Sequence, residues 1–411
     1  MKISGKHLMV LVGMCGLLAS GIGLVTNVSG LFFSPVAEEF GIMKGSASLM
    51  VTICNITLAL GGMLVPRVLN EKTLKPLMIG ATAVLALSTA ALSLCHSIMP
   101  MYLLCVLRGF SAGFVTFVFA TTVLNQWFVA NIGLATSIAM GCSGIAGAAF
   151  SPVVSGIISS AGWRTGFVVL GLLTVALNLP AIIFVPSLDP RTKGLMPLGG
   201  EDAVEPQRKA APKGRKTKVE SKAAPLDQVL FVAVMAFALL GSAVTALPQH
   251  FPGIAESYAL DAAIGASMLS FCMIANTAGK IALGALIDRI GTRISVLLYA
   301  VLVAVGLALM LIMRSPQMLI VAAVMVGLCY ALGTVAISMI TRDAFGLANY
   351  GRAYPTMSLA GNMANAVFSS VVGFMFDFSG GYALPLVMLF AMTIAMGAIV
   401  VFVYARKPAQ A

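Results

Sequence analysis

The chain has 411 residues, of which 59% are hydrophobic and only 9% are charged. Soluble domains carry about a quarter charged residues, so this composition excludes an ordinary soluble protein and indicates several membrane-spanning segments. The formal net charge is +11, but nine of the 25 Lys and Arg residues fall between positions 191 and 222. We therefore expect a basic loop that sets membrane topology and no nucleic-acid surface.

Apolar segments long enough to cross a bilayer follow one another along the chain. The first, from Leu8 to Phe33, is too long for the core of a signal peptide and is predicted to be an uncleaved span. Eleven further segments lie near residues 46–66, 75–95, 99–124, 132–160, 163–186, 226–248, 262–287, 293–313, 316–340, 351–376 and 382–404. Each approaches or exceeds the roughly 20 residues that a spanning helix needs. The sequence therefore predicts an all-α membrane protein with twelve transmembrane helices.

A polar segment, residues 187–225, separates these spans into two sets of six. It is rich in Pro, Lys, Arg and Ala and almost without large apolar residues, as in a flexible linker. We therefore predict an N-terminal six-helix bundle over residues 1–186, a basic linker over 187–225 and a C-terminal bundle over 226–411. Lys and Arg are concentrated in the short loops on the side of this linker, which predicts that both termini are cytoplasmic.

The two halves repeat weakly. Three pairs of matching residues have similar offsets: Arg67 and Arg289 at 222 (289 − 67), Gly133 and Gly351 at 218 (351 − 133), and Gly162 and Gly381 at 219 (381 − 162). Parallel repeats of six spans are typical of transporters that work by alternating access.

The stretch from Ser270 to Arg293 combines an apolar helix with a charged turn. Lys280 lies eight residues before Asp288, or roughly 12 Å along a helix, which predicts a position deep in a hydrocarbon core about 30 Å thick. A lysine there is costly, and the apolar part of this helix contains no acidic residue. We predict that Lys280 binds an anion, and that Asn276, one turn away on the same face, either orients the ammonium or simply satisfies its hydrogen bonding. The alternative is that Lys280 extends towards the membrane surface beside Asn276.

Sequence motifs accompany this helix. They are Gly284-x-x-x-Asp288-Arg289-x-Gly291-x-Arg293, Phe33-Ser34-Pro35-Val36 through Gly41, Asn125-Gln126-Trp127-Phe128 through Ala135, and Asp343-Ala344-Phe345-Gly346 through Gly351. Together with the two six-span halves, they resemble the major facilitator superfamily over the whole chain, and within it the oxalate/formate-antiporter and monocarboxylate-transporter branch.

This resemblance implies the major facilitator fold and a secondary transporter. It also implies that Lys280, where the branch carries a cation, pairs with the substrate carboxylate. Met357 stands about where the oxalate antiporters add a second cation, which favours a monocarboxylate over a dicarboxylate. The first-half turn departs from the family because Pro66 replaces its Asp.

Other polar residues within the predicted spans are candidates for the lining of a substrate cavity. Arg108 resembles the fourth-span arginine of the superfamily, and either adds a second cavity cation or braces the helices through hydrogen bonds. The remaining candidates are Thr116 on the fourth span, Tyr330 and Thr334 on the tenth, and Asn362 and Asn365 on the eleventh. For the two asparagines, structural hydrogen bonding between helices is the alternative. We expect Asp288, Arg289 and Arg293, with Arg67 in the first half, to gate transport without binding substrate.

The sequence contains no Walker loop, no metal-spaced His or Cys set, no nucleophile elbow and no carboxylate pair within the spans. We therefore expect no enzyme, metal or cofactor, but a secondary transporter of a small organic anion in a bacterial cytoplasmic membrane. Its expected partners are substrate and lipid, with a monomer as the simplest state. Efflux of amphipathic compounds and a non-transporting membrane sensor are the alternatives.

The lack of deep carboxylates favours anion exchange over proton symport, although symport through Lys280 stays open.

Overall fold

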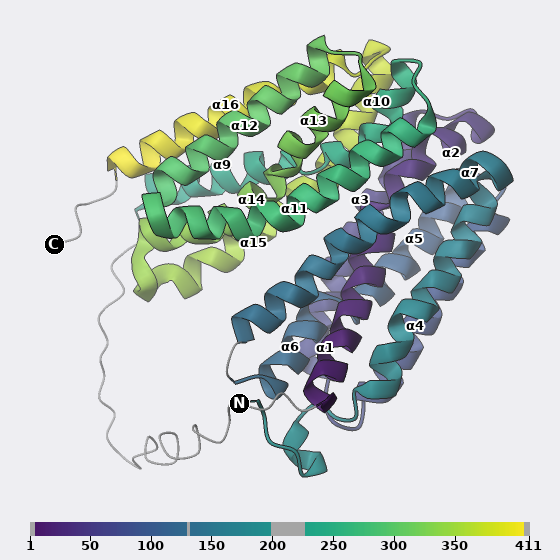
Figure 1. The fold of residues 1–411 in the computed structure, drawn as a ribbon, viewed down its shortest axis with the longest axis vertical. Helices are drawn as coiled ribbons and strands as arrows, with labels where there is room; N and C mark the ends of the chain where they lie inside the picture. Colours follow the sequence, from purple (N-terminus) through teal and green to yellow (C-terminus); the bar gives the residue numbers. More distant parts are fainter. Residues whose placement is uncertain (1–4, 130–131, 199–226, 407–411) are drawn as a thin grey trace. The chain divides into compact units, whose positions relative to one another are not determined.

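The structure, a computed structural model, describes residues 5–129, 132–198 and 227–406. The helices before residue 199 are α1 (Gly5–Leu18), η1 (Ala19–Asn27), η2 (Ser29–Phe32), α2 (Phe33–Phe40), α3 (Lys44–Val68), α4 (Leu74–Ala91), η3 (Leu92–Leu94), α5 (Ile98–Gly113), α6 (Phe117–Trp127), α7 (Ile132–Phe184) and η4 (Pro190–Lys193) (Figure 1). Those after residue 226 are α9 (Gln228–Val244), η5 (Leu247–His250), α10 (Phe251–Ser257), α11 (Ala262–Ile290), α12 (Thr292–Ile312), α13 (Pro316–Gly327), α14 (Cys329–Ala331), η6 (Leu332–Ala336), α15 (Ile337–Ser379) and α16 (Ala383–Arg406). No strand occurs in these described ranges, which confirms the predicted all-α class.

Eleven helical segments of the described chain are long and apolar enough to cross a membrane. One of them, Leu134–Phe184, has 51 residues, more than twice the roughly 20 that one span requires. Gly162 interrupts this segment with φ 82° and ψ 162°, a backbone conformation that glycine adopts without steric cost. The break lies between the predicted spans 132–160 and 163–186, whereas the total of twelve spans stays a prediction.

The first predicted span is not one continuous α-helix. The α-helix α1 ends at Leu18 and is followed by a nine-residue π-helix, η1, and then by the short 3₁₀ helix η2, which leads into α2. The predicted first span therefore contains three kinds of helix in succession. An apolar run predicts burial and length, but it does not determine which carbonyl each backbone N–H contacts.

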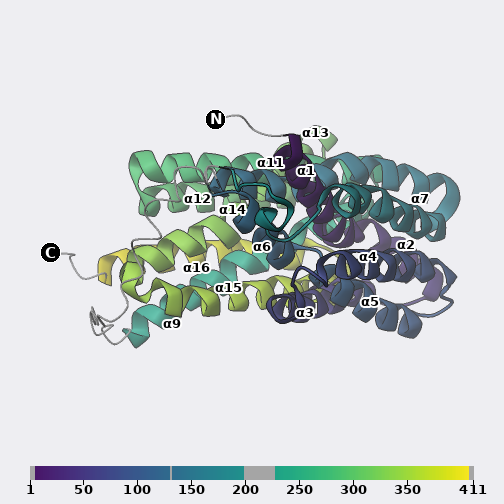
Figure 2. The ribbon, with the colours of Figure 1, turned by 90° about the horizontal axis from the view of Figure 1, so that it is seen from below.

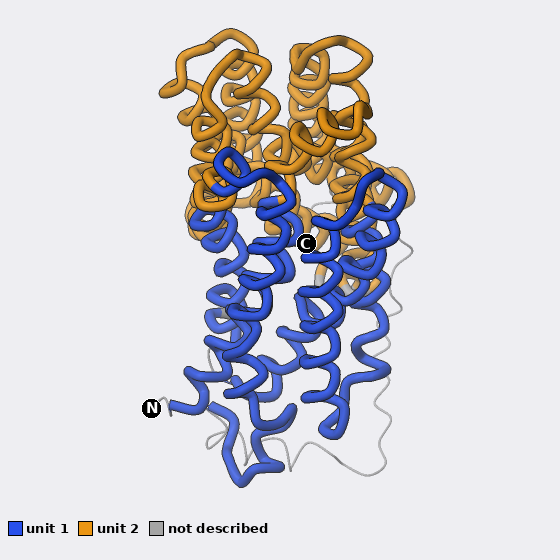
Figure 3. Tube along the Cα trace, turned by 90° about the vertical axis from the view of Figure 1, so that its right-hand side faces the viewer, with its two compact units in different colours: residues 1–28, 53–150, 157–219 blue, residues 29–52, 151–156, 220–411 orange. Residues whose placement is uncertain are grey.

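Contacts along the chain define two compact units (Figure 3). Unit 1 consists of residues 1–28, 53–150 and 157–219, and unit 2 of residues 29–52, 151–156 and 220–411. Unit 2 therefore contains the second set of spans together with η2, α2, the start of α3 and a short piece of α7. The predicted domain boundaries at 186 and 226 stay a prediction, because residues 199–225 of the predicted linker and residue 226 lie outside the described residues.

Each unit is held by close helix pairs. In unit 2, α9 packs on α15 and α16 (Figure 2), and α11 packs on α13. At this second contact, a Cβ atom added to Gly327 would lie 2.6 Å from the carbonyl oxygen of Cys272. Only glycine allows so close an approach, so this contact fixes the helix that carries Lys280. In unit 1, α4 packs on α5 and α1 packs on α6.

Candidate functional site

The predicted anion-binding lysine lies in the second half of α11. This helix is capped at its N-terminus by Asp261, whose carboxylate accepts a hydrogen bond from the N–H of Ala263, and at its C-terminus by Gly291 with φ 82°. The Lys280 side chain is half-buried, and its Nζ lies 5.9 Å from the ring centroid of Tyr330. This distance is at the outer limit, about 6 Å, for a cation over an aromatic ring. Lys280 has no ion pair or hydrogen bond with another residue of the described chain.

The backbone next to Lys280 is fixed by neighbouring helices. The hydroxyl of Tyr299 on α12 donates a hydrogen bond of 2.9 Å to the carbonyl oxygen of Gly279. Gly279 is itself buried, and a Cβ atom added there would lie 2.8 Å from the side chain of Leu328. The cation therefore projects from a rigid turn of α11, which is what a binding group requires if it is to keep its geometry.

Asn276 lies one helical turn before Lys280, on the same face of α11. Its side chain is 6% exposed, and its Oδ1 atom is buried without a hydrogen-bond donor among the described residues. Its Nδ2 atom has only a weak contact of 3.9 Å with the sulfur of Met273. An unpaired buried acceptor costs about 1–3 kcal/mol, so this amide oxygen requires a donor from water, from the Lys280 ammonium or from a ligand.

The remaining candidates of unit 2 divide into two groups. Asn365 donates a hydrogen bond of 2.7 Å from Nδ2 to Oγ1 of Thr245 on α9, and Thr334 donates one of 2.6 Å to the carbonyl oxygen of Tyr330. Their polar groups are thus used within the helix bundle. Asn362 is exposed, and Tyr330 is the candidate that the structure brings next to Lys280.

Arg108 and Thr116 belong to unit 1. Arg108 is 2% exposed, and its guanidinium donates from Nε to Oγ1 of Thr89 (3.2 Å) and from Nη2 to the carbonyl oxygen of Leu24 (3.4 Å). It therefore connects α5 with α4 and with the π-helix η1. Thr116, 1% exposed, lies between α5 and α6, and its methyl group packs against Gly21 of η1.

The candidate gating residues lie at helix ends. Asp288, Arg289 and Arg293 are exposed around Gly291, the single residue that separates α11 from α12. Arg67 is exposed in the last turn of α3, directly after Pro66. In the described part of the chain, Asp288 forms no ion pair.

A polar contact at the start of α3 was not predicted from the sequence. We call it the α3 anchor, and it consists of Lys44, Gly45, Glu256 and Asp377. The Asp377 carboxylate accepts hydrogen bonds from the backbone N–H groups of Lys44 (2.9 Å) and Gly45 (2.7 Å). The Lys44 ammonium lies 3.0 Å from the Glu256 carboxylate. A carboxylate at the N-terminus of a helix is stabilised by the helix dipole, so the anchor attaches α3 to α15 and α10 within unit 2. Sequence spacing gives no signal for it, because Lys44 and Asp377 are 333 positions apart.

Comparison with known protein families shows one match over most of the chain. The model of the Major Facilitator Superfamily matches residues 14–293 and 229–411. The fold is also similar to solved transporter structures. The nucleoside transporter NupG superimposes with a TM-score of 0.71 at 14% identity, covering 97% of this chain and 100% of that one. A bacterial homologue of the human lysosomal transporter Spinster, in an inward-facing and occupied conformation, gives a TM-score of 0.69 at 13% identity over 99% and 98% of the two chains.

Curated relatives are similar at low identity. Monocarboxylate transporter 4 of Rattus norvegicus is 27% identical over 179 residues, which are 43% of this chain and 37% of that protein. The MFS-type transporter pytF of Aspergillus terreus (strain NIH 2624 / FGSC A1156) is 24% identical over 237 residues, or 57% of this chain and 73% of that protein. The match to the first relative thus spans little more than a third of its length.

Proposed function

The chain belongs to the Major Facilitator Superfamily, and from this premise we propose that it is a secondary transporter of a small monocarboxylate whose carboxylate is bound by Lys280. Membership makes the protein an integral membrane transporter and not an enzyme. The observation that carries the proposal is the half-buried Lys280 ammonium, which has no counter-charge in the described chain. One helical turn before it on α11 lies Asn276, whose buried amide oxygen has no hydrogen-bond donor among the described residues. A carboxylate supplies the missing negative charge through charge-assisted hydrogen bonds.

The neighbouring side chains are consistent with one carboxylate per substrate. The Asn276 Oδ1 atom can accept one of the three ammonium hydrogens of Lys280, which leaves the other two directed at the anion. The Tyr330 ring covers the cation on one side. Met357 is fully buried where the family resemblance places a second cation for dicarboxylates, so a second carboxylate would be desolvated without a partner at that position.

We propose that alternating access opens the α3 anchor in one of the two conformational states. The anchor keeps the start of α3 on α15, and its carboxylate and ammonium can be rehydrated when the contact opens. The exposed turn at Asp288 and Arg289 would act at the other end of the spans by changing a conformational equilibrium. On this basis, Asp288→Asn slows turnover and leaves substrate affinity within a few-fold.

Transport measurements with Lys280 variants test the binding role. Purified protein in proteoliposomes is assayed for uptake of labelled acetate, lactate and pyruvate, with oxalate and succinate as competing dicarboxylates. We expect saturable uptake by the wild type, a loss with Lys280→Ala and partial activity with Lys280→Arg. Ile281→Ala is the matched control, because Ile281 is the next residue of α11 and is 69% exposed. Wild-type uptake by Lys280→Ala would contradict the proposal.

The coupling mode needs a separate measurement. We propose exchange of one anion for another, because the predicted spans have no deep carboxylate to carry a proton. In lightly buffered proteoliposomes without internal anion, exchange predicts little uptake and no external pH change. Uptake with external alkalinisation would instead show proton symport, and its loss in Lys280→Arg would assign the proton to the lysine.

A further inference from the structure

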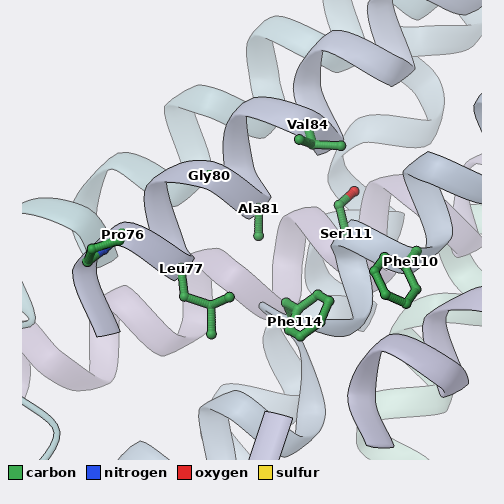
Figure 4. Close-up of a pocket in the computed structure, with 8 residues that line it drawn as sticks. All are labelled: Pro76, Leu77, Gly80, Ala81, Val84, Phe110, Ser111 and Phe114. Atoms are coloured by element: carbon green, nitrogen blue, oxygen red, sulfur yellow. The ribbon is translucent and has the colours of Figure 1, made fainter. Parts of the chain in front are cut away.

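A shallow apolar recess lies between α4 and α5 in unit 1. It has a volume of about 260 Å³ and is lined by Pro76, Leu77, Gly80, Ala81 and Val84 of α4 and by Phe110, Ser111 and Phe114 of α5 and its end. Figure 4 shows Leu77 and Ala81 directed towards the side of the recess that Phe114 and Phe110 form. The Ser111 hydroxyl donates to the carbonyl oxygens of Leu107 and Arg108, so it offers the recess no free donor.

The recess exists because α4 has small residues where α5 has large ones. A Cβ atom added to Gly80 would meet no atom within 4 Å, so the space beside it is open. The opposite wall is formed by Phe110 and Phe114, whose ring centroids lie 5.2 Å apart at an interplanar angle of 80°. Phe110 and Val84 are 38% and 44% exposed. The recess is thus an open groove on the surface of the helix pair.

The groove lies at the depth of the membrane, because Leu74–Leu94 and Ile98–Trp127 both qualify as spanning segments. From Pro76 to Val84 is eight residues, or roughly 12 Å along a helix, close to half of a hydrocarbon core about 30 Å thick. The groove therefore extends through one leaflet. Its volume is below the roughly 300–1,000 Å³ of pockets for drug-sized ligands, which favours a slender chain over a ring system.

A basic rim lies at the Pro76 end of the groove. Residues 67–76 contain three cations, Arg67, Lys72 and Lys75, and a single carboxylate, Glu71. The Glu71 carboxylate is already used, because it accepts hydrogen bonds from the backbone N–H groups of Leu188 (3.0 Å) and Asp189 (2.6 Å). Lys75 donates to the carbonyl oxygen of Ile182 (2.7 Å), whereas Lys72 and Arg67 are exposed. Clusters of Lys and Arg at a membrane surface attract anionic headgroups.

We propose that this groove and its rim bind one anionic phospholipid from the leaflet on the side of the α3–α4 turn. One acyl chain occupies the space beside Gly80, between Leu77 and the two phenylalanine rings. The phosphate lies at the rim, near Lys72. The site is separate from Lys280 and does not depend on the transported substrate.

The test uses the full chain in detergent micelles doped with either phosphatidylglycerol or phosphatidylcholine of identical acyl chains. Native mass spectrometry counts bound lipid, and a thermal-unfolding assay measures the shift that each lipid causes. We expect one retained phosphatidylglycerol on the wild type and at least a fivefold weaker retention of phosphatidylcholine. Gly80→Leu fills the groove without a backbone clash and should abolish retention of both lipids. Lys72→Gln should weaken phosphatidylglycerol alone, towards the phosphatidylcholine value.

The matched control is Gly156→Leu on α7, an exposed position where an added Cβ atom also meets nothing within 4 Å. Both substitutions replace an exposed helical glycine by leucine and gain similar helix propensity, so only the filled groove distinguishes them. Unchanged phosphatidylglycerol retention by Gly80→Leu would overturn the proposal. Equal retention of the two lipids, unaffected by Lys72→Gln, would overturn the role of the rim. A dimer that Gly80→Leu dissociates would show instead that a second copy covers the groove.

Discussion

Lys280 of α11 and Arg108 of α5 are both cations within apolar spans, yet their surroundings differ. The Arg108 guanidinium is 2% exposed and donates to partners on two neighbouring elements. The Lys280 ammonium is half-buried and has an aromatic ring as its neighbour but no described hydrogen-bond acceptor. A satisfied charge stabilises one arrangement of helices, whereas an unsatisfied one is available to a ligand. The hydrogen bonds around a membrane cation, more than its depth, therefore indicate its role.

The largest expected effect is a loss of anion affinity when Lys280 is replaced, and this loss distinguishes Lys280 from Arg108. Lys280→Ala should lose at least about 100-fold in anion affinity, equivalent to two steps of 1.4 kcal/mol, because the binding charge is removed. The melting temperature of the unliganded protein should stay the same or rise, because an unpaired charge is also removed. Thermal-shift titration with pyruvate measures both quantities. An unliganded protein that unfolds many degrees earlier would show that Lys280 has a structural role.

Arg108 should show the reverse behaviour. Arg108→Gln loses two charge-assisted hydrogen bonds, each worth about 1.5–3 kcal/mol, so we expect the free energy of unfolding to fall by about 3 kcal/mol. Anion affinity of the folded fraction should stay within a few-fold. Denaturant unfolding in detergent and ligand titration measure the two. Thr89→Val, which removes one acceptor, is the graded control, and a loss of affinity matching that of Lys280→Ala would make Arg108 a second binding cation.

A substitution at Asn276 tests whether this residue contributes to anion binding by Lys280 on the same helix, α11. Asn276→Leu removes the unpaired buried oxygen, so the melting temperature should stay constant or increase. Anion affinity should fall about tenfold, or 1.4 kcal/mol, because the ammonium loses its orienting acceptor. Thr277→Val, on the adjacent residue, is the isosteric control. If both variants bind pyruvate like the wild type, Asn276 does not take part in the site.

The α3 anchor offers a third charged contact, of intermediate strength. Asp377→Asn keeps the shape of the side chain but removes the charge at the N-terminus of α3, a change worth about 1 kcal/mol. This corresponds to about a fivefold shift in the opening equilibrium. We expect a fivefold faster reaction of a cysteine placed at the buried Ser48 with a membrane-impermeant thiol reagent, after the natural thiols are blocked. Phe378→Ala, at an exposed neighbour, should leave the rate unchanged.

The smallest expected effect concerns an exposed ion pair. Nε of Arg406 lies 3.1 Å from Oδ2 of Asp227, and its hydrogen bond holds the pKa of the Asp227 carboxyl below the ordinary value. A depressed carboxyl pKa stabilises the fold above the unfolded pKa of about 3.9 and stops doing so as the pH falls through the folded value. The melting temperature of the wild type should exceed that of Arg406→Gln slightly at pH 6. The difference should shrink towards pH 3, and a difference that grows in acid would exclude this pair as its source.

The sequence predicted the helical class, the break near Gly162 and the isolated position of Lys280 in its helix, because apolar run length and single charges are local properties. Family membership also followed from local motifs. The unpaired oxygen of Asn276 could not be predicted, since it depends on which helices pack around α11. The α3 anchor and the Arg108 contacts join residues far apart in the chain. The roles of all these residues at a substrate site stay predictions.

The π-helix η1 has a further consequence for the comparison of this chain with its relatives. A π-helix contains an additional residue in its turn, and each residue of a helix rotates the following side chains by about 100°, since 3.6 residues make one turn. At the end of η1, Thr26 donates to Oδ1 of Asn55 (3.1 Å) and Asn27 donates to the carbonyl oxygen of Ser143 (3.1 Å). A relative with a regular α-helix here would present different side chains unless it were one residue shorter. A sequence alignment across residues 19–27 therefore needs a one-residue gap wherever a homologue lacks the π-helix. An insertion of one residue at this point changes which polar side chains lie on one face of the first span, and it leaves the mean hydropathy of the span almost unchanged.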